Sequence, residues 1–342
     1  MLEVLSPGAY ATIQDLGRRG YRRLGVPWSG ALDPVMLRVA NALLGRAEGA
    51  PAIEAFDGGL HLAARNGPVR LAVAGAVELE RLGGDGVQRE RPWRVLVLEA
   101  DENLRIRRMA GGRLAVVAVA GLTCPTVLGS AATYPRAELG GWEGRPLRSG
   151  AQLALMPVTG AMAWRRCGAP GRVRGPIRVV FGPQDDYFSS GTRAAFLANE
   201  YRIGKEADRM GIRLEGPPLA HLGPSEILSD AIVPGAIQVP GNGQPMVLLA
   251  DAQTAGGYPK IATVIGVDLP RLADLPMGSP LRFAEVSVAE ATDLARQAEA
   301  GVRSFIAGLG EGMPAGWDES ALYGANLVGG VIDAFRPGQD GS

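Results

Sequence analysis

The stretch Ser229–Leu269, SDAIVPGAIQVPGNGQPMVLLADAQTAGGYPKIATVIGVDL, decides the fold that this sequence is expected to adopt. It contains three short apolar runs, Ala236–Val239, Met246–Leu249 and Ile261–Val264, and turns rich in glycine and proline separate them. Short apolar runs bounded by such turns are typical of β-strands. We therefore expect a β-rich segment in which polar side chains gather on turns between strands.

The same pattern extends outward through the chain. Further strand-like runs lie at Arg70–Ala76, Val95–Leu98, Leu104–Arg107, Arg113–Ala120, Ile177–Phe181 and Leu281–Val286. Many short strands with frequent turns favour β-barrels or sandwiches. The segment GPIRVVFGP (Gly175–Pro183) echoes GPVRLAVAG (Gly67–Gly75). Two β-barrel domains of related design would explain the echo, and so would a chance similarity of two buried strands.

Three helices interrupt the strands. Asp33 is a good N-cap, Pro34 suits the first helical position, and an apolar stripe continues until Gly45. A second helix is expected over Thr192–Glu200. The third begins at Ser287, which forms a capping box with Glu290, and continues to about Ala307.

The length of 342 residues suggests about two domains, and GAPGRVRGP (Gly168–Pro176) has the composition of a linker. We predict an N-terminal β-rich domain over 1–172, a C-terminal β-barrel domain over 173–300, and a helix end with an apolar tail over 301–342. We expect the tail to pack on the body or on a second copy of the chain through Leu322, Leu327, Val328, Val331, Ile332 and Phe335.

Composition narrows the class of protein. Lys+Arg and Asp+Glu both number 35, so no basic face is expected for nucleic acid. The N-terminus has no basic segment followed by an apolar core, and the longest apolar run, Leu114–Leu122, is too short to span a bilayer. The two cysteines, Cys124 and Cys167, suit buried thiols in a reducing compartment. These features predict a cytoplasmic globular protein without a membrane partner.

Several standard signatures are missing from the sequence. It has no P-loop, no dinucleotide-binding glycine motif, no GxSxG elbow and no Cys/His cluster, and its two histidines, His61 and His221, stand alone. No metal site is therefore expected, and any chemistry must come from lysine, carboxylates, amides, tyrosine or the backbone.

Two clusters of such residues have alternative explanations. In the first, Gln14, Asp15 and Ser29 would line a substrate pocket, or would serve turns and helix capping. In the second, the adjacent carboxylates of Asp185 and Asp186 would hold a cation or orient a substrate. Alternatively, they would cap the following helix, with Asp208 and Arg209 forming a surface pair.

The third cluster lies in the opening stretch, where Gln238, Asn242, Gln253, Tyr258 and Lys260 would converge at strand ends. Amides and an ammonium suit an amide, urea or carboxylate ligand, although hairpin turns alone would also explain the pattern. The chain has only one other lysine, Lys205. We expect Lys260 to stabilise a developing oxyanion or a substrate carboxylate and Gln253 to hold the amide edge, so these two are the predicted catalytic residues.

Several segments in order resemble a known family. They are TIQDLGRRGYRRLGVPWSGALDP from Thr12, FGPQDDYF from Phe181, DRMGIRLEGP from Asp208, SDAIVPGAIQVPGNGQP from Ser229 and ADAQTAGGYPKIATVI from Ala250. Together they resemble the KipA family, also called allophanate hydrolase subunit 2 or biotin-dependent carboxyltransferase, whose members include one of the subunits of 5-oxoprolinase. The resemblance covers roughly residues 1–290. Ala252 and Ala255 stand where family members commonly carry an arginine and a threonine.

This resemblance implies a mainly β fold with cyclophilin-like barrels and a few short helices. It also implies a subunit of an ATP-dependent 5-oxoproline hydrolase that opens the lactam to glutamate, with ATP bound in the complex. The implied partners are a KipI-type protein and a LamB/YcsF-type protein, and self-association as a homo-oligomer stays open. Two alternatives remain: a carboxyltransferase acting on urea or a similar amide with biotin carried by another chain, and a regulator that binds a KipI-type kinase inhibitor.

Overall fold

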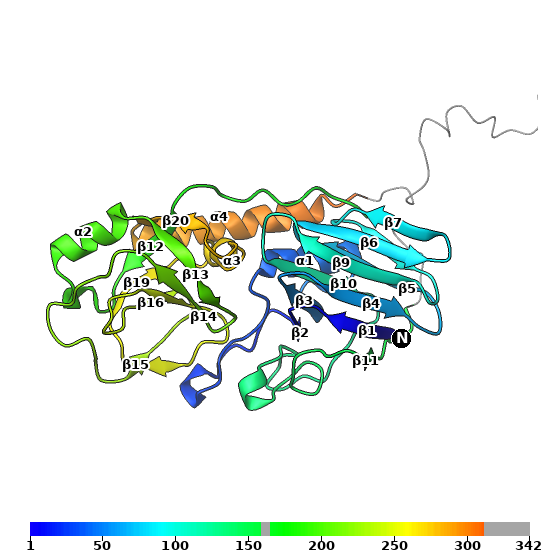
Figure 1. The fold of residues 1–342 in the computed structure, drawn as a ribbon, viewed down its shortest axis with the longest axis horizontal. Coiled ribbons are helices and arrows are strands. Elements are labelled where there is room, and N and C mark those ends of the chain that lie inside the picture. Colours follow the sequence, from blue (N-terminus) through cyan, green and yellow to red (C-terminus); the bar gives the residue numbers. More distant parts are fainter. Residues whose placement is uncertain (159–164, 311–342) are drawn as a thin grey trace, which may run out of the picture.

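Two β-rich halves make up the part of the chain that the computed structural model describes, residues 1–158 and 165–310 (Figure 1). The first half holds a six-stranded sheet in the order β11-β1-β4-β9-β6-β7 and a five-stranded sheet in the order β2-β3-β10-β5-β8. The strands are β1 (Leu2–Pro7), β2 (Tyr10–Gln14), β3 (Ala52–Phe56), β4 (Leu60–Ala64), β5 (Val69–Ala74), β6 (Val77–Gly83), β7 (Gly86–Glu90), β8 (Val95–Leu98), β9 (Asn103–Met109), β10 (Leu114–Val119) and β11 (Ala151–Leu153).

The five-stranded sheet is buried on both of its faces. Along β10, Ala115, Val117 and Val119 belong to the core between the two sheets, whereas Leu114 and Val116 belong to the core on the opposite face. Successive strand residues point to opposite faces, so burial on both sides requires an unbroken apolar run. This explains why residues 114–119 read as a continuous apolar segment in the sequence.

The second half is an eight-stranded sheet in the order β20-β13-β14-β17-β16-β19-β12-β21, with a separate two-stranded ribbon, β15-β18. All its neighbouring strands are antiparallel except β12 and β21, which are parallel. The strands are β12 (Ile177–Phe181), β13 (Tyr201–Ala207), β14 (Gly211–Glu215), β15 (Asp230–Ala231), β16 (Ala236–Gln238), β17 (Met246–Leu248), β18 (Ala255–Gly256), β19 (Lys260–Val264), β20 (Pro280–Leu281) and β21 (Phe283–Glu285). The expected mainly β fold with barrel-like halves is confirmed.

Four α-helices and three short 3-10 helices connect these strands in the described ranges: α1 (Pro34–Leu43), α2 (Ser190–Ala198), α3 (Leu269–Ala273), α4 (Val288–Ala307), η1 (Arg22–Leu24), η2 (Pro135–Ala137) and η3 (Asp185–Tyr187). Asp33 caps α1 and accepts hydrogen bonds from two backbone amides of its first turn. The predicted capping box of Ser287 and Glu290 is present at the start of α4. The second predicted helix is shifted: α2 begins at Ser190, because the Ser189 hydroxyl provides its cap. The sequence did not reveal α3.

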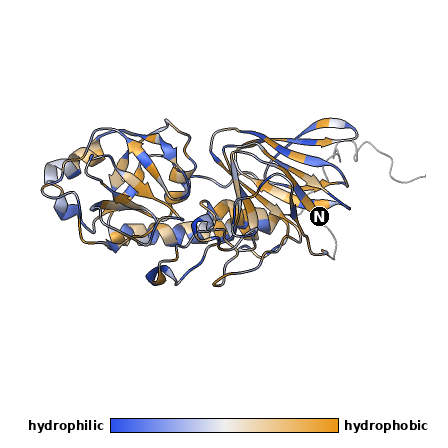
Figure 2. Cartoon of the chain, turned by 60° about the horizontal axis from the view of Figure 1, so that its bottom comes forward, coloured by the Kyte–Doolittle hydropathy of each residue, from blue (hydrophilic) through white to orange (hydrophobic). Residues whose placement is uncertain are grey.

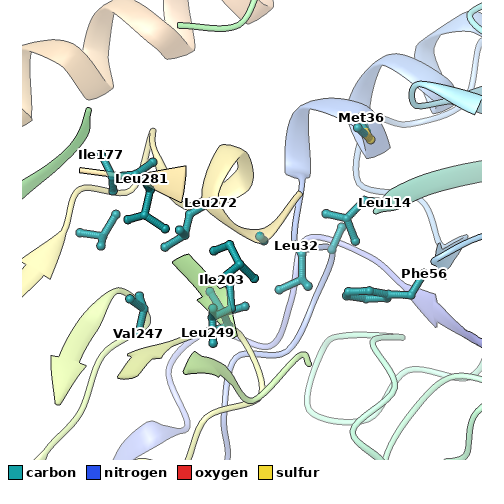
Figure 3. Close-up of a cluster of buried hydrophobic side chains, with 14 of the residues drawn as sticks. Leu32, Met36, Phe56, Leu114, Ile177, Ile203, Val247, Leu249, Leu272 and Leu281 are labelled. Carbon is teal, nitrogen blue, oxygen red and sulfur yellow. The ribbon is translucent and has the colours of Figure 1, made fainter. Parts of the chain in front are cut away.

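One hydrophobic core joins the two halves. Figure 3 shows Leu32, Phe56 and Leu114 of the first half facing Ile203, Leu249 and Leu272 of the second, and all belong to a single buried cluster. Apolar residues likewise run along the strands of both halves in Figure 2. The two halves, each with its own sheets, therefore bury apolar side chains against one another.

The helix α4 and the connecting segment run together along one side of both halves (Figure 1). They line a cavity of about 960 Å³ with α1. Arg172 of the connecting segment pairs there with Asp33 of the first half and Asp274 of the second. The predicted boundary at residue 172 lies between the last strand of the first half and the first of the second, whereas α4 extends across the predicted boundary at residue 300.

Two further expectations concern thiols and the tail. Cys124 and Cys167 are free and partly buried, and burial raises the pKa of each thiol to about 11. The apolar residues expected to anchor the tail lie outside the described residues.

No helix within the described ranges is long and apolar enough to cross a bilayer.

Candidate functional site

The third sequence cluster forms a polar site between the β15-β18 ribbon and strands β16 and β19. Gln238, the last residue of β16, lies opposite Lys260, the first residue of β19. The ribbon pairs Asp230 with Gly256. Four segments, which occur along the chain in the order β15, β16, β18 and β19, are therefore paired two by two; β15 lies toward the lower edge of the second half in Figure 1.

Lys260 is buried, with 1 % of its surface exposed. Its Nζ donates to Oδ2 of Asp230 at 2.9 Å, and the side-chain amide of Gln184 donates to the same oxygen at 3.0 Å. The Lys260 backbone N–H donates to Oε1 of Gln184 at 3.3 Å. These contacts hold the ammonium in a fixed position, because a buried charge requires a partner.

The carboxylate that faces Lys260 is strongly acidic. Hydrogen bonds from Lys260, from Gln184 and from the Ala231 backbone lower the pKa of Asp230 to about 2. Asp230 is therefore ionised throughout the neutral range. Its side chain is 46 % exposed, so the ion pair lies at the boundary between the interior and solvent. The Asp230 carboxylate is therefore the side of the ion pair that solvent reaches, whereas the Lys260 side chain is almost fully covered.

Gln238 is fully buried, and neither its side-chain nitrogen nor its oxygen has a hydrogen-bond partner among the described residues. Leaving a buried polar group unpaired costs about 1–3 kcal/mol. Most buried polar groups in folded proteins are paired, so an amide with two unpaired atoms beside a lysine is a candidate ligand position. The amide can donate to a carbonyl oxygen and accept from an N–H group at the same time.

The backbone of Gly256 packs closely against this amide. A methyl group on its Cα would lie 2.8 Å from Nε2 of Gln238 and 2.6 Å from Cδ1 of Ile232. The same position is 3.7 Å from Nε2 of Gln253. Gly256 therefore has to be glycine, and the amides of Gln238 and Gln253 both lie close to it. Tyr258, at 38 % exposure, and Gln253 are the exposed members of this group.

The structure does not bring every predicted site residue to this place. The Gln14 amide is buried in the first half, where it forms hydrogen bonds with Thr12, Thr133 and the Gly30 backbone. The carboxylate of Asp15 accepts from Gly17, Ser130 and Ala131. The hydrogen bonds of both side chains therefore stabilise loops of the first half and do not face the third-cluster site.

Two other predicted residues also serve turns. Asn242 is exposed and accepts a hydrogen bond from the Gln244 backbone. Ser29 is buried, has a φ of 51°, and donates its backbone N–H to Ala250. The Ser29 hydroxyl has no partner among the described residues, but its surroundings belong to the contact between the two halves.

The second sequence cluster separates in space. Asp185 pairs with Arg193 on α2, and Ser189 rather than a carboxylate caps that helix. The hypothesis of a surface pair between Asp208 and Arg209 is wrong: Arg209 is buried and pairs with Glu54 and Asp251. Within residues 1–158 and 165–310, no group of three or more His, Cys, Asp or Glu side chains is placed to hold a metal ion.

Three residues of the site were not singled out as site residues from the sequence. Asp230 and Gln184 hold Lys260 in place, and Arg22 reaches the ribbon from the first half. Asp230 lies within the opening stretch and Gln184 directly precedes Asp185 of the second cluster, so both are close to residues that the sequence identifies as candidates. Arg22 lies within the segment from Thr12 that resembles the family, but its contacts lie more than 200 residues away, so the sequence alone assigns it no role.

The arrangement suits a small planar ligand with a carbonyl oxygen and an N–H group, such as an amide, a lactam or a urea. For such a ligand, Lys260 would be a compact cation next to an oxygen that gains negative charge, and Gln238 would offer one donor and one acceptor. Fixed donors of this kind stabilise charge as it develops in a transition state.

Comparison with known proteins shows relatives over most of the chain. Residues 24–285 match the family model described as carboxyltransferase domain, subdomain A and B. The chain is 37% identical over 301 residues to a 5-oxoprolinase subunit of Escherichia coli, an alignment that covers 85% of this chain and 93% of that protein. It is 40% identical over 301 residues to the 5-oxoprolinase subunit of the same name from Haemophilus influenzae, with 87% and 96% covered.

A solved structure shares the fold. The crystal structure of the K. lactis urea amidolyase superimposes with a TM-score of 0.80 at 25% identity, over 91% of this chain and 20% of that chain. Both β-rich halves are therefore present together within a part of that much longer protein.

Proposed function

Since this chain belongs to the family of carboxyltransferase domains with subdomains A and B, we propose that it is a subunit of an ATP-dependent 5-oxoprolinase. The observation that carries the proposal is the 37–40% identity to two proteins named as 5-oxoprolinase subunits, over more than nine-tenths of each. A protein named as one subunit of an enzyme works with others. We propose a KipI-type protein and a LamB/YcsF-type protein as the partners here.

In the proposed reaction, ATP and water are consumed and 5-oxoproline becomes glutamate, with ADP and phosphate as the other products. An amide carbonyl is a poor electrophile until its oxygen is phosphorylated. Lys260 would stabilise negative charge on that oxygen, and Gln238 and Gln253 would hold the lactam N–H and C=O in one plane. ATP would bind in the assembled complex, since this chain has no P-loop.

A second candidate is supported by the family description and by the fold shared with urea amidolyase. Under this alternative, the chain would transfer a carboxyl group to a urea-like amide. Biotin would then be carried by another polypeptide, because this sequence has no attachment tripeptide. The same planar polar site would accept either ligand, so the distinction requires an assay.

The deciding experiment is to co-express this chain with KipI-type and LamB/YcsF-type proteins from one organism and to purify the complex. We expect co-elution at micromolar concentration and glutamate release that requires both ATP and 5-oxoproline. Specific interfaces of standard size bury roughly 1,600 Å² in total, enough for co-elution. Complexes lacking this chain are the control.

Two results would contradict the proposal. One is an assembled complex that releases no glutamate. The other is full activity in the complex that lacks this chain. ATP-dependent carboxylation of urea on addition of a biotinylated carrier and its carboxylase would instead support the second candidate.

A further inference from the structure

Three arginines lie close together in the segment that enters η1. Arg18 is buried, Arg22 is half-buried and Arg19 is exposed, and desolvation by the surrounding protein lowers the pKa of each guanidinium. None of them forms an ion pair with a carboxylate in the described part of the chain. Arg18 is occupied by the backbone carbonyls of Val127, Ser130 and Ala132. All three lack an anion among the described residues, but Arg18 lies away from the ribbon with its Nε and Nη2 on these carbonyls, which leaves Arg19 and Arg22 as the candidates for binding an anion.

Both remaining guanidinium groups lie over one aromatic ring. The Cζ atom of Arg19 is 4.0 Å from the centre of the Trp28 ring, and that of Arg22 is 5.4 Å from it. A guanidinium stacked on an aromatic ring keeps its in-plane N–H groups free for a planar acceptor. The ring thus fixes two cationic groups in position.

Arg22 crosses from the first half to the second. Its Nη2 donates to the carbonyl of Ile232, next to β15, and lies 3.5 Å from the carbonyl of Gln253. Its Nη1 is buried and has no hydrogen-bond partner among the described residues. The protein therefore provides acceptors for the Nη2 group of this guanidinium but, among the described residues, none for its Nη1 group.

The contacts of Arg22 place it beside the amide site. Ile232 and Gln253, whose carbonyls it approaches, also have side chains that lie close to Gly256, and the Gln238 amide lies close to the same glycine. Arg22 therefore reaches the same part of the β15-β18 ribbon as the Gln238 amide. Two independent observations indicate a ligand here: a fully buried amide and a guanidinium N–H group, neither with a partner in the described ranges.

We propose that Arg22, held on Trp28 together with Arg19, binds the carboxylate of the substrate and thereby selects a carboxylate-bearing lactam over an uncharged amide. This inference rests on the proposed function and adds a specificity determinant to it. A carboxylate forms two parallel hydrogen bonds with a guanidinium, which an ammonium cannot reproduce. Urea has no carboxylate and would leave Arg22 without an anion.

The test compares 5-oxoproline with 2-pyrrolidinone, the same lactam without its carboxylate. In the assembled complex, kcat/KM is measured for both substrates with the wild type, Arg22→Ala, Arg22→Lys and Arg23→Ala. Arg23 is the matched control, because it is exposed and adjacent to Arg22 in the sequence. Binding of both lactams to the same complexes is measured by titration calorimetry, and melting temperatures confirm folding.

The wild type should prefer 5-oxoproline, and Arg22→Ala should lower that preference about 10- to 100-fold, mainly through KM, because a hydrogen bond to a charged group is lost. Arg22→Lys should give an intermediate preference, and Arg23→Ala should keep the wild-type preference. An unchanged preference in Arg22→Ala, with wild-type activity on 5-oxoproline, would overturn the inference and leave the proposed function intact.

The binding measurement distinguishes a failure of the proposed 5-oxoprolinase reaction from a failure of the proposed carboxylate site. If the complex releases no glutamate but binds 5-oxoproline in an Arg22-dependent way, the proposed reaction is wrong and the carboxylate site stands. If a well-folded wild-type complex binds neither lactam, or binds both equally well, the carboxylate site is contradicted.

Discussion

The guanidinium of Arg209 in the second half donates a hydrogen bond to the carboxylate of Glu54 in the first, and both side chains are buried. Arg209 also pairs with Asp251 and donates to the Gly30 carbonyl. Burial alone would lower the pKa of Arg209, but the carboxylates of Asp251 and Glu54 raise it. One cation therefore neutralises an acid from each half of the molecule.

Replacing this cation should weaken the whole structure. Arg209→Met leaves two buried carboxylates without a counter-ion, a change that typically costs about 3–5 kcal/mol. We expect a corresponding fall in the urea midpoint of unfolding. Arg213→Met is the matched control, because Arg213 pairs with Glu206 on the surface and such pairs contribute about 0–1 kcal/mol. Equal midpoints for the two variants would contradict a central role for the buried triad.

Two buried glutamines allow a direct comparison of a ligand-binding amide with a structural one. Gln14 makes three hydrogen bonds, whereas the Gln238 side chain makes none with the described residues, and both are fully buried. Gln14→Leu should destabilise the protein by about 1–3 kcal/mol, because it leaves its partners unpaired. Gln238→Leu should leave the free energy of unfolding unchanged or raise it, while impairing activity.

The comparison is read by thermal melting together with glutamate release from the assembled complex. A destabilised Gln238→Leu variant would show that its amide is paired by something other than a ligand. A stable and fully active variant would remove Gln238 from the site.

The ion pair of Lys260 and Asp230 predicts a pH dependence. The folded state holds the pKa of Asp230 at about 2, below its usual 3.8. A lowered carboxyl pKa contributes stability that is fully present above the unfolded pKa and is lost as the pH falls through the folded pKa. The difference in unfolding free energy between the wild type and Asp230→Asn should thus be constant above about pH 4 and shrink between about pH 4 and pH 2. A difference that stays constant across this window would contradict the pairing.

Local signals in the sequence were sufficient for much of the fold. The cap at Asp33, the capping box at Ser287 and the apolar run at residues 114–119 each act over a few residues, so the sequence displays them directly. Lys260 was also identified from a local signal, because the glycine-rich segment Gly256–Pro259 directly precedes it.

The rest depends on contacts between distant residues. Asp208 and Arg209 are adjacent and opposite in charge, which suggested a surface pair. In the fold, the Asp208 carboxylate accepts two backbone N–H groups of its own turn, while Arg209 points inward to Glu54. Likewise, Arg22 meets Ile232 only because the two halves pack together. The spacing of residues along the chain does not predict contacts of this kind between distant segments.

The most direct test of the account is the activity of Lys260→Met in the assembled complex. Methionine keeps most of the buried volume, and Asp230 remains partly exposed, so folding and co-elution with the partners should be retained. Loss of one preorganised donor costs about 10²-fold or more in rate, so glutamate release should fall by about that factor. Lys205→Met, at the other and exposed lysine, should keep wild-type activity. Wild-type turnover by a folded, partner-bound Lys260→Met complex would contradict the assignment of the site.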